Sequence, residues 1–398
     1  MQNISRRDFL KQTGLATMSM MLPGFLQGTS FKRLYGSRAG KVLVVIQLSG
    51  GNDGLNTIIP YRNDLYHKYR PRLRYKADEV IRLSDEQGLH PSLAPLQALY
   101  DQGRMAILNG VGYPEPVRSH FRSMDIWHTA SGSRDYRTSG WLGRYLDAQA
   151  EAPPYHALEM DDTLSLALKG DTRDGFATRR LEQLKRVAHH PYFAAVADHA
   201  DEHHHAQADY LYRVMAETQS SAAYLYSQAK QRRDRGSYPR ERFGNDLRRV
   251  ADLIMADTDT RIYYVTLDGF DTHANQRNKQ ARLLKQYAEA VCAFTDDLAA
   301  NGLLDDTLIM TFSEFGRRVK QNGSGGTDHG TANNVWLIGG GLQKAGFYND
   351  APILTDLDEG DLKYTVDFRR VYSDILTKWL EADASAVLGG SFEGLGLL

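Results

Sequence analysis

The sequence predicts an α/β fold in which a mainly parallel central sheet is flanked by helices. Short, continuous apolar runs recur along the chain and are typical of strands buried on both faces. Stretches with helical periodicity separate these runs. Clusters of glycine and polar residues follow several runs, as expected where parallel strands end beside a ligand. These three patterns agree on one architecture.

The first predicted strand is KVLVVIQL at residues 41–48, a β-branched apolar run that stops at Ser-Gly-Gly-Asn-Asp-Gly. Strands of the same kind are predicted at residues 104–111, 261–267, 307–312 and 335–338. Helical patterns cover residues 93–102, 181–189, 193–230, 245–257, 279–301 and 368–380. Because the predicted strands alternate with helices, most of them are expected to run parallel.

Residues 40–398 are expected to form a single α/β domain, since no linker rich in proline, glycine or serine divides them. Residues 150–240 are rich in alanine, histidine, glutamine and tyrosine, and are predicted to be a mostly helical insertion. Three consecutive histidines at 203–205 lie in this stretch. On a helix they point in different directions, so a solvated face is favoured over a shared metal ion.

The composition excludes several classes of protein. Of the 398 residues, 42% are hydrophobic and 24% are charged, which is typical of a globular protein. A formal net charge of −1 provides no basic field for nucleic acid. The single cysteine, Cys292, rules out an internal disulfide framework. No apolar run approaches the roughly 20 residues that a permanent membrane span requires.

The N-terminal residues have the pattern of a targeting signal. Residues 5–11, Ser-Arg-Arg-Asp-Phe-Leu-Lys, resemble a twin-arginine export signal, and a modest apolar stretch follows at 14–25. The alternative is an ordinary amphipathic helix that carries two adjacent arginines. We expect residues 1–39 to be a signal region read by the twin-arginine export machinery, which would place the protein in the periplasm or outside the cell.

Polar residues follow the first predicted strand in the segment SGGNDGLN. Its glycines allow close backbone approach, and Asn52 and Asp53 offer hard oxygen ligands. A tight turn with an Asx cap explains the segment nearly as well. It is not a nucleotide-binding loop, because the Walker lysine and the GxGxxG spacing are missing.

The second cluster is Val-Arg-Ser-His-Phe-Arg, residues 117–122, at the predicted start of a helix. The hydroxyl of Ser119 is either a helix N-cap or a nucleophile presented at the positive end of the helix. His120 adjoins it as a metal ligand or proton donor. Arg118 and Arg122 are close enough in sequence to hold an anionic substrate.

A third cluster, LDGFDTHA, follows the strand predicted at residues 261–267. A carboxylate and an imidazole two residues apart in a loop, such as Asp271 and His273, can both reach one divalent ion. An Asx turn leading into the next helix is the structural alternative. We favour the ligand interpretation.

A fourth cluster follows the strand predicted at residues 307–312, where Glu314 comes directly after the strand end. The glycine-rich segment NGSGGTDHGT then brings Asp328 and His329 back toward the same edge. A hydrogen-bonded loop histidine without a ligand is possible here, but glycines around an Asp-His pair suit close ligand approach.

Taken together, these clusters place Asp, Glu and His side chains at the ends of at least three strands. Such mixed nitrogen and oxygen ligands suit zinc, manganese, iron or calcium. Two ions held about 3.5–4 Å apart would activate a nucleophile and stabilise the leaving oxygen of a phosphate or sulfate ester.

Four segments between residues 44 and 331 resemble, in order, a bacterial family that is exported by the twin-arginine route and catalogued only as a domain of unknown function. They are VVIQLSGGNDGLNTIIPY, GVGYPEPVRSHFRSMDIWHTA, LDGFDTHANQ and MTFSEFGRRVKQNGSGGTDHGT. Their order also resembles the alkaline phosphatase/sulfatase superfamily, whose members carry metal ligands at the strand ends of a parallel sheet.

The superfamily resemblance implies roles for individual residues. Asp53 takes the position of the acidic ligand after the first strand, and Ser119 that of the nucleophile. Glu314 would stand for the strand-end acidic ligand of a second metal. The ligands of the first metal would be Asp271, His273 and His329.

The sequence departs from this superfamily in places. Phe315 follows Glu314 where the superfamily has histidine, so the second metal would lack an imidazole. No Cys-x-Pro-x-Arg or Ser-x-Pro-x-Arg motif occurs, which excludes a formylglycine sulfatase. We expect a metal-dependent hydrolase of phosphate or sulfate esters, acting on a small-molecule or glycan ester with zinc, manganese or calcium. The alternative is a non-catalytic exported binding or scaffold protein on the same fold.

Overall fold

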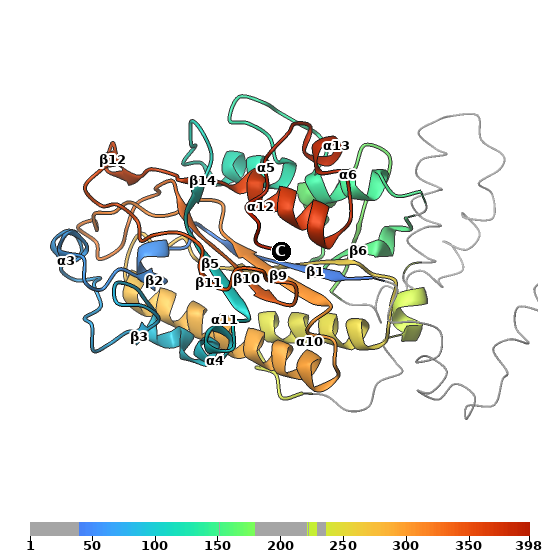
Figure 1. The fold of residues 1–398 in the computed structure, drawn as a ribbon, viewed down its shortest axis with the longest axis horizontal. Helices are drawn as coiled ribbons and strands as arrows, with labels where there is room; N and C mark the ends of the chain where they lie inside the picture. The colour runs from blue at the N-terminus through green and yellow to red at the C-terminus, as the bar shows by residue number, and fades with distance from the viewer. Residues whose placement is uncertain (1–39, 151, 180–220, 222, 229–235) are drawn as a thin grey trace, which may run out of the picture. The chain divides into compact units, whose positions relative to one another are not determined.

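The computed structural model describes residues 40–150, 152–179, 221, 223–228 and 236–398. Its centre is a nine-stranded sheet in the order β11-β5-β10-β9-β1-β8-β6-β7, with β14 pairing with β5 (Figure 1). Four of the predicted strands are confirmed to within a residue at each end: β1 (Val42–Ser49), β5 (Met105–Gly112), β8 (Ile262–Asp268) and β9 (Thr307–Phe312). β1 lies between β8 and β9 and is parallel to both.

The fifth predicted strand, β10 (Asn333–Gly339), runs against its two neighbours, β5 and β9. It follows β9 through a loop and without a crossover helix, and a strand joined to its neighbour in this way runs antiparallel. The sheet is therefore mixed, with β5, β9, β1 and β8 sharing one direction. Their carboxyl ends lie at the same edge.

Short strands extend both sides of this sheet and form two small sheets beside it. β6 (Ala157–Glu159) and β7 (Phe176–Ala177) continue it beyond β8, so residues 152–179 of the predicted insertion contribute strands. The helices predicted at 181–189 and 193–230 lie almost entirely outside the described residues. The remaining strands are β11 (Gly346–Phe347), β14 (Val366–Asp367), β2 (Ile58–Ile59), β3 (Ile81–Arg82), β4 (Gly88–Leu89), β12 (Leu357–Asp358) and β13 (Asp361–Leu362).

Helices cover both faces of the sheet (Figure 1). One face carries η3 (Pro91–Leu96), α4 (Gln97–Asp101), α10 (Arg242–Met255) and α11 (Gln276–Ala300). The other carries α5 (His120–Thr129), α6 (Trp141–Asp147), α12 (Phe368–Asp374), the π-helical turn η7 (Ile375–Trp379) and α13 (Ala384–Leu388). The short helix α3 (Asp64–Tyr69) and the turns η2 (Gly54–Asn56), η4 (Pro154–His156) and η5 (Leu166–Leu168) lie in connections. Within the described residues, no helix has both the length and the apolar character needed to cross a membrane.

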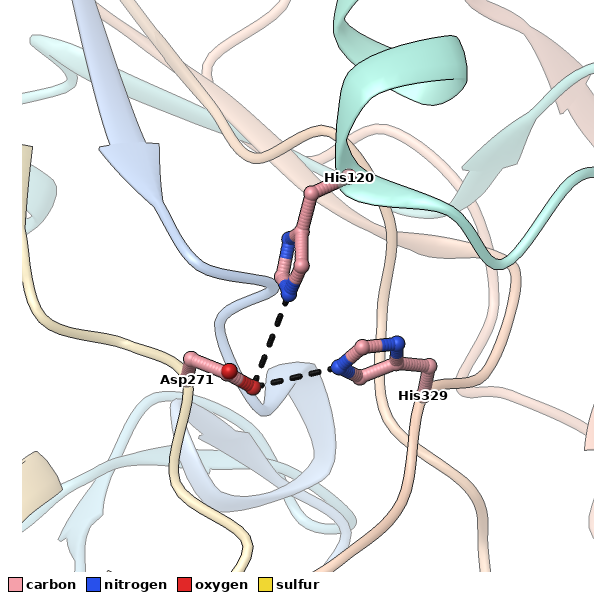
Figure 2. A group of neighbouring side chains, drawn as sticks. All are labelled: His120, Asp271 and His329. Atoms are coloured by element: carbon pink, nitrogen blue, oxygen red, sulfur yellow. Dashed lines mark hydrogen bonds and ion pairs between the residues drawn. The ribbon is translucent and has the colours of Figure 1, made fainter.

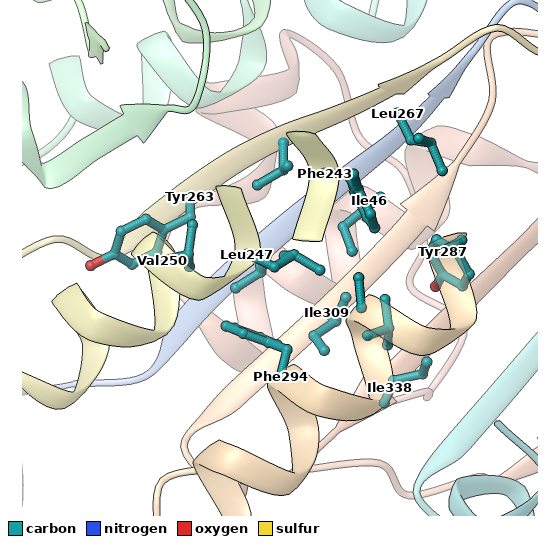
Figure 3. Close-up of a cluster of buried hydrophobic side chains, with 14 of the residues drawn as sticks. Ile46, Phe243, Leu247, Val250, Tyr263, Leu267, Tyr287, Phe294, Ile309 and Ile338 are labelled. Atoms are coloured by element: carbon teal, nitrogen blue, oxygen red, sulfur yellow. The ribbon is translucent and has the colours of Figure 1, made fainter. Parts of the chain in front are cut away.

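The two helical layers explain why the first strand is mostly apolar on both of its faces. Val44 and Ile46 of β1 belong to the core beneath α10 and α11 (Figure 3), whereas Leu43 and Val45 belong to the core beneath α5, α6 and α12. Successive side chains of a strand point to opposite faces, and here both faces are covered.

A buried hydrogen-bonded chain connects α11 to the sheet. The Tyr287 hydroxyl lies 2.8 Å from Thr311 Oγ1 of β9 and accepts a hydrogen bond from Trp336 Nε1 of β10 at 2.7 Å. Replacing Tyr287 with Phe leaves the indole N–H without a partner in a dry core. We expect Tyr287→Phe to lower the free energy of unfolding by about 1–3 kcal/mol, measured by urea denaturation.

The matched control is Tyr364→Phe, which removes the hydroxyl of a tyrosine that is 39% exposed. Its free energy of unfolding should stay within about 0.5 kcal/mol of the parent value. Equal effects of the two substitutions would contradict the structural role assigned to the Tyr287 hydroxyl.

Candidate functional site

Loops after β5, β8 and β9 meet at the carboxyl edge of the sheet and carry a cluster of histidines and carboxylates. The loop after β5 leads into α5, whose first residue is His120. Asp271 and His273 lie in the loop between β8 and α11. His329 lies in the long connection between β9 and β10. The predicted convergence of strand ends therefore brings these side chains together.

His120, Asp271 and His329 form the centre of this cluster (Figure 2). One ligand atom from each residue lies within 4.8 Å of the other two. Asp271 Oδ1 is 3.6 Å from His120 Nε2 and 3.1 Å from His329 Nε2. We define these three residues as the central triad.

Glu314 holds the ring of His120 from behind. The Glu314 side chain is fully buried, and its Oε1 lies 2.8 Å from His120 Nδ1. The same oxygen accepts a hydrogen bond from the backbone N–H of Gly50 at 2.9 Å. The hydrogen bond to Glu314 raises the pKa of His120 above its usual value, against the effect of burial. Glu314 thus orients the imidazole so that Nε2 faces Asp271, whereas the sequence predicted it as a metal ligand.

The ring of His329 is held by a backbone group. Its Nδ1 lies 2.9 Å from the carbonyl oxygen of Arg118, which can only accept, so Nδ1 carries the proton. The backbone of His329 also pairs with Arg317 in an isolated antiparallel bridge. The glycine-rich segment after β9 is therefore folded back on itself, and it presents His329 Nε2 to the centre.

His273 lies beside the triad on its more exposed side. Its Nε2 is 3.1 Å from Asp271 Oδ1 and 3.0 Å from His329 Nε2. Its Nδ1 lies 3.4 Å from Asp328 Oδ1. Asp328 thus contacts the ring nitrogen of His273 that faces away from the centre.

The Asp271 carboxylate is fixed by Arg317, whose Nη2 donates to Oδ1 at 2.8 Å. Burial alone would raise the pKa of Asp271, but the hydrogen bond from Arg317 and the positive charge of its guanidinium outweigh burial and lower the pKa below its usual value. Asp271 is therefore ionised across the physiological range. It brings a negative charge to the point where the imidazoles meet.

This arrangement suits a cation. Since Nδ1 of His120 and of His329 faces an acceptor, each Nε2 directs a lone pair toward the anionic Asp271 oxygen. His120 Nε2 is buried and has no hydrogen-bond partner among the described residues. Neighbouring ligand atoms of a tetrahedral site with bonds of about 2.0–2.1 Å lie about 3.3 Å apart. The spacings of 3.0–3.6 Å around Asp271 and His329 match that value.

Ser119 occupies the N-cap position of α5, directly before His120. Its side chain makes no capping hydrogen bond, and the residue is exposed. The sequence left two roles open for Ser119, helix N-cap or nucleophile. Ser119 has the N-cap position, but its hydroxyl does not make the capping hydrogen bond. Ser119 is thus an exposed residue next to His120 in the chain.

The two arginines predicted to hold an anion already have partners. Arg118 Nε donates to the buried Asp361 carboxylate at 2.7 Å. The Arg122 guanidinium donates to the carbonyl oxygens of Gly132, Ser133 and Asp135. Neither guanidinium is directed at the central triad by these contacts, so we leave both outside the candidate site.

Asp53 does not join the cluster either. It is fully buried, and its Oδ2 pairs with Arg70 Nη1 at 2.5 Å and accepts a hydrogen bond from Gln276. Asp53 precedes the turn η2, which turns its carboxylate toward these two residues. Asp53, predicted as a metal ligand, is thus part of a buried ion pair in this structure and lies outside the central triad.

The sequence did not predict that Arg317 would fix Asp271, or that Gly50 and Gly51 would allow neighbouring loops to pack closely. At Gly50 (φ +114°) a Cβ would lie 2.4 Å from the Asp271 nitrogen, and at Gly51 (φ +72°) it would lie 2.2 Å from the Phe315 ring. The close approach that these glycines permit is thus between loops of the protein. The only signal in the sequence was the position of Arg317 in the segment that follows a strand end.

The fold and the cluster together define an α/β protein with a candidate metal centre at the carboxyl edge of its sheet. The profile of the family described as Protein of unknown function (DUF1501) matches residues 74–377, which is more than half of the chain. The chain belongs to this family. A comparison with curated protein sequences found no match.

Solved structures resemble the fold at low identity. The C-terminal periplasmic domain of EcEptC from Escherichia coli, in complex with Zn, is 10% identical with a TM-score of 0.36, over 77% of this chain and 74% of that chain. A protein in the alkaline phosphatase superfamily from Vibrio parahaemolyticus is 11% identical with a TM-score of 0.33, over 80% and 64%. The PsFucS1 sulfatase from Pseudoalteromonas sp. is 12% identical with a TM-score of 0.40, over 92% and 74%. One of these structures is thus described as a member of the alkaline phosphatase superfamily, which the order of the sequence motifs also resembles.

Substitution of Arg317 tests how far the site depends on its buried guanidinium group. Lysine keeps the charge but cannot donate to acceptors in several directions within a plane. We expect Arg317→Lys to lower the free energy of unfolding by about 1–3 kcal/mol, because lysine leaves buried carbonyl acceptors without a donor, measured by urea denaturation.

The adjacent Arg318 provides the control, because its side chain is 38% exposed and its nearest carboxylate oxygen, on Asp361, is 3.6 Å away. Arg318→Lys should change stability by less than about 1 kcal/mol. If Arg317→Lys were equally mild, the guanidinium would not be the structural centre of these loops.

Proposed function

We propose that this chain is a metal-dependent hydrolase of phosphate or sulfate esters with one metal ion at the central triad. The observation that carries the proposal is the convergence of His120 Nε2, His329 Nε2 and Asp271 Oδ1 within 4.8 Å of one another. Imidazole nitrogens with fixed tautomers and an ionised carboxylate are the donors of catalytic transition-metal sites.

The donor set narrows the choice of metal. Calcium takes six to eight oxygen ligands, whereas this cluster offers nitrogen from His120, His329 and the adjacent His273. Imidazole-rich sites suit zinc, iron or copper, and a mixed site also accepts manganese. We propose zinc or another transition metal, and leave out the calcium that the sequence also allowed.

A single ion is favoured over two. The carboxylates predicted to hold a second ion are Asp53 and Glu314. Asp53 is paired with Arg70, and Glu314 with His120 and the Gly50 N–H. Each already has a cationic or hydrogen-bonding partner in the protein. Binding a second ion there would require these buried interactions to break.

The residues around the triad support ester hydrolysis. A divalent ion held there would polarise an ester oxygen and lower the pKa of the attacking hydroxyl. The hydroxyl of Ser119, an exposed residue next to His120 at the start of α5, is the proposed nucleophile. The first backbone N–H groups of α5 lack helical partners and would favour the negative charge of a phosphate or sulfate group.

We also propose export to the periplasm or beyond, on the strength of the twin-arginine pattern at residues 5–11. A fusion of residues 1–39 to a reporter would test it. Export should be lost when Arg6 and Arg7 are both replaced by lysine, or when the host lacks the twin-arginine machinery. Export that persists under both changes would overturn this part of the proposal.

The experiment for the main proposal is elemental analysis of protein purified without chelator, followed by assay on phosphate and sulfate monoesters and diesters. We expect one transition-metal equivalent per chain and metal-dependent turnover. His329→Ala should lose both, whereas Ser119→Ala should lose turnover and retain the metal.

The control is His156→Ala, which removes a partly buried histidine at the start of β6, the opposite end of the sheet from the site. It should keep both properties. Absence of bound metal in the parent protein would overturn the proposal. Bound metal without turnover on any ester would favour the binding or scaffold role on the same fold.

A further inference from the structure

We infer that the side chains at the centre differ in function: the central triad retains the ion, and His273 is an exchangeable ligand at the position that the substrate oxygen takes. The inference rests on the proposed function and assigns a role to one further residue within it. It follows from how firmly each imidazole is held.

The two histidines of the triad are fixed from behind by groups that cannot move away. His120 is 26% exposed and lies 2.8 Å from Glu314, which is fully buried. His329 is 23% exposed and lies 2.9 Å from the Arg118 carbonyl, a backbone group. Asp271 is held by the buried guanidinium of Arg317. Although Asp271 is 50% exposed, it shares with the two histidines a support from a fully buried side chain or a backbone group.

His273 has a weaker support. Its side chain is 46% exposed, and its Nδ1 lies 3.4 Å from Asp328, whose own side chain is 60% exposed. A hydrogen bond of that length to a solvated carboxylate constrains a ring far less than a contact of 2.8 Å inside the protein. The backbone of His273 is held, since its carbonyl accepts a hydrogen bond from Asn322 at 2.9 Å. Rotation of the side chain alone would therefore withdraw the imidazole.

The position of His273 Nε2 is nevertheless that of a ligand, because it lies 3.1 Å from Asp271 Oδ1 and 3.0 Å from His329 Nε2. Four fixed protein ligands would close a tetrahedral site, whereas catalytic sites keep three protein ligands and an open position. A firmly held triad with a loosely held fourth imidazole satisfies both conditions: His273 lies at a ligand position, and that position can become open. His273 completes the coordination at rest and yields its place to an oxygen of the substrate.

The first test is zinc affinity, measured by competition with a chromogenic chelator, for the full-length protein and four variants. His120→Ala and His329→Ala should weaken zinc binding by at least about 100-fold, because each removes a ligand of the triad. His273→Ala should weaken it by no more than about 10-fold. The control His156→Ala should bind as the parent does.

The second test is the visible absorption of the cobalt(II)-loaded protein, which reports the number and kind of ligands. His273→Ala should change the spectrum, and added imidazole should restore it. Inorganic phosphate added to the parent protein should shift its spectrum in the direction of His273→Ala, because phosphate oxygen replaces the same imidazole.

The outcomes separate this inference from the proposed function. If the parent protein binds neither zinc nor cobalt, the metal centre itself is wrong. If it binds them but His273→Ala loses as much affinity as His329→Ala, the metal centre stands and the exchangeable role of His273 is wrong. An unchanged cobalt spectrum in His273→Ala would equally overturn that role, since His273 would then not be a ligand.

Discussion

The candidate site depends on the buried guanidinium of Arg317. Its nitrogens donate to the carbonyl oxygens of Gly50, Gly51, Phe270 and Thr327, and to the Asp271 carboxylate. These acceptors belong to the loops after β1, β8 and β9. A charge removed from water is tolerated only when it is surrounded by acceptors, so the three loops must converge on this one group. Convergence of the loops in turn places Asp271 and His329 beside each other.

That requirement explains the glycines at the end of the first strand. Gly50 offers its carbonyl to Arg317 and its N–H to Glu314, and it lies so close to Asp271 that a side chain would not fit. Glu314 then fixes His120, which comes from a fourth strand end. Gly50 is thus connected to Asp271 through the Arg317 guanidinium and to His120 through the buried Glu314 carboxylate. These contacts are made by the protein itself, without a ligand.

Much of this could be predicted from the sequence. The runs that became β1 and β9 are mostly apolar because both faces of the sheet are covered. Parallel strand ends share an edge, as predicted. Roles that depend on three-dimensional partners could not be predicted. Nothing in Phe-Gly-Arg-Arg distinguishes the fully buried Arg317 from the partly exposed Arg318. The carboxylate of Asp53 looked available because Arg70, which neutralises it, lies in another segment. The direction of β10 depended on the path of the loop before it.

The distribution of charge around the centre favours one ion over two. The sequence predicted Asp53 and Glu314 as metal ligands. In the structure Asp53 pairs with Arg70, and Glu314 contacts His120 and the Gly50 N–H. Arg317 adds a permanent positive charge at Asp271, where it contacts Oδ1 at 2.8 Å. The same oxygen faces the Nε2 atoms of the triad, so one side of it is neutralised by the protein and the other is directed at the imidazole lone pairs. This asymmetry is the basis for proposing one cation at the triad, since Asp53 and Glu314, the two carboxylates predicted to hold a second ion, already contact Arg70 and His120.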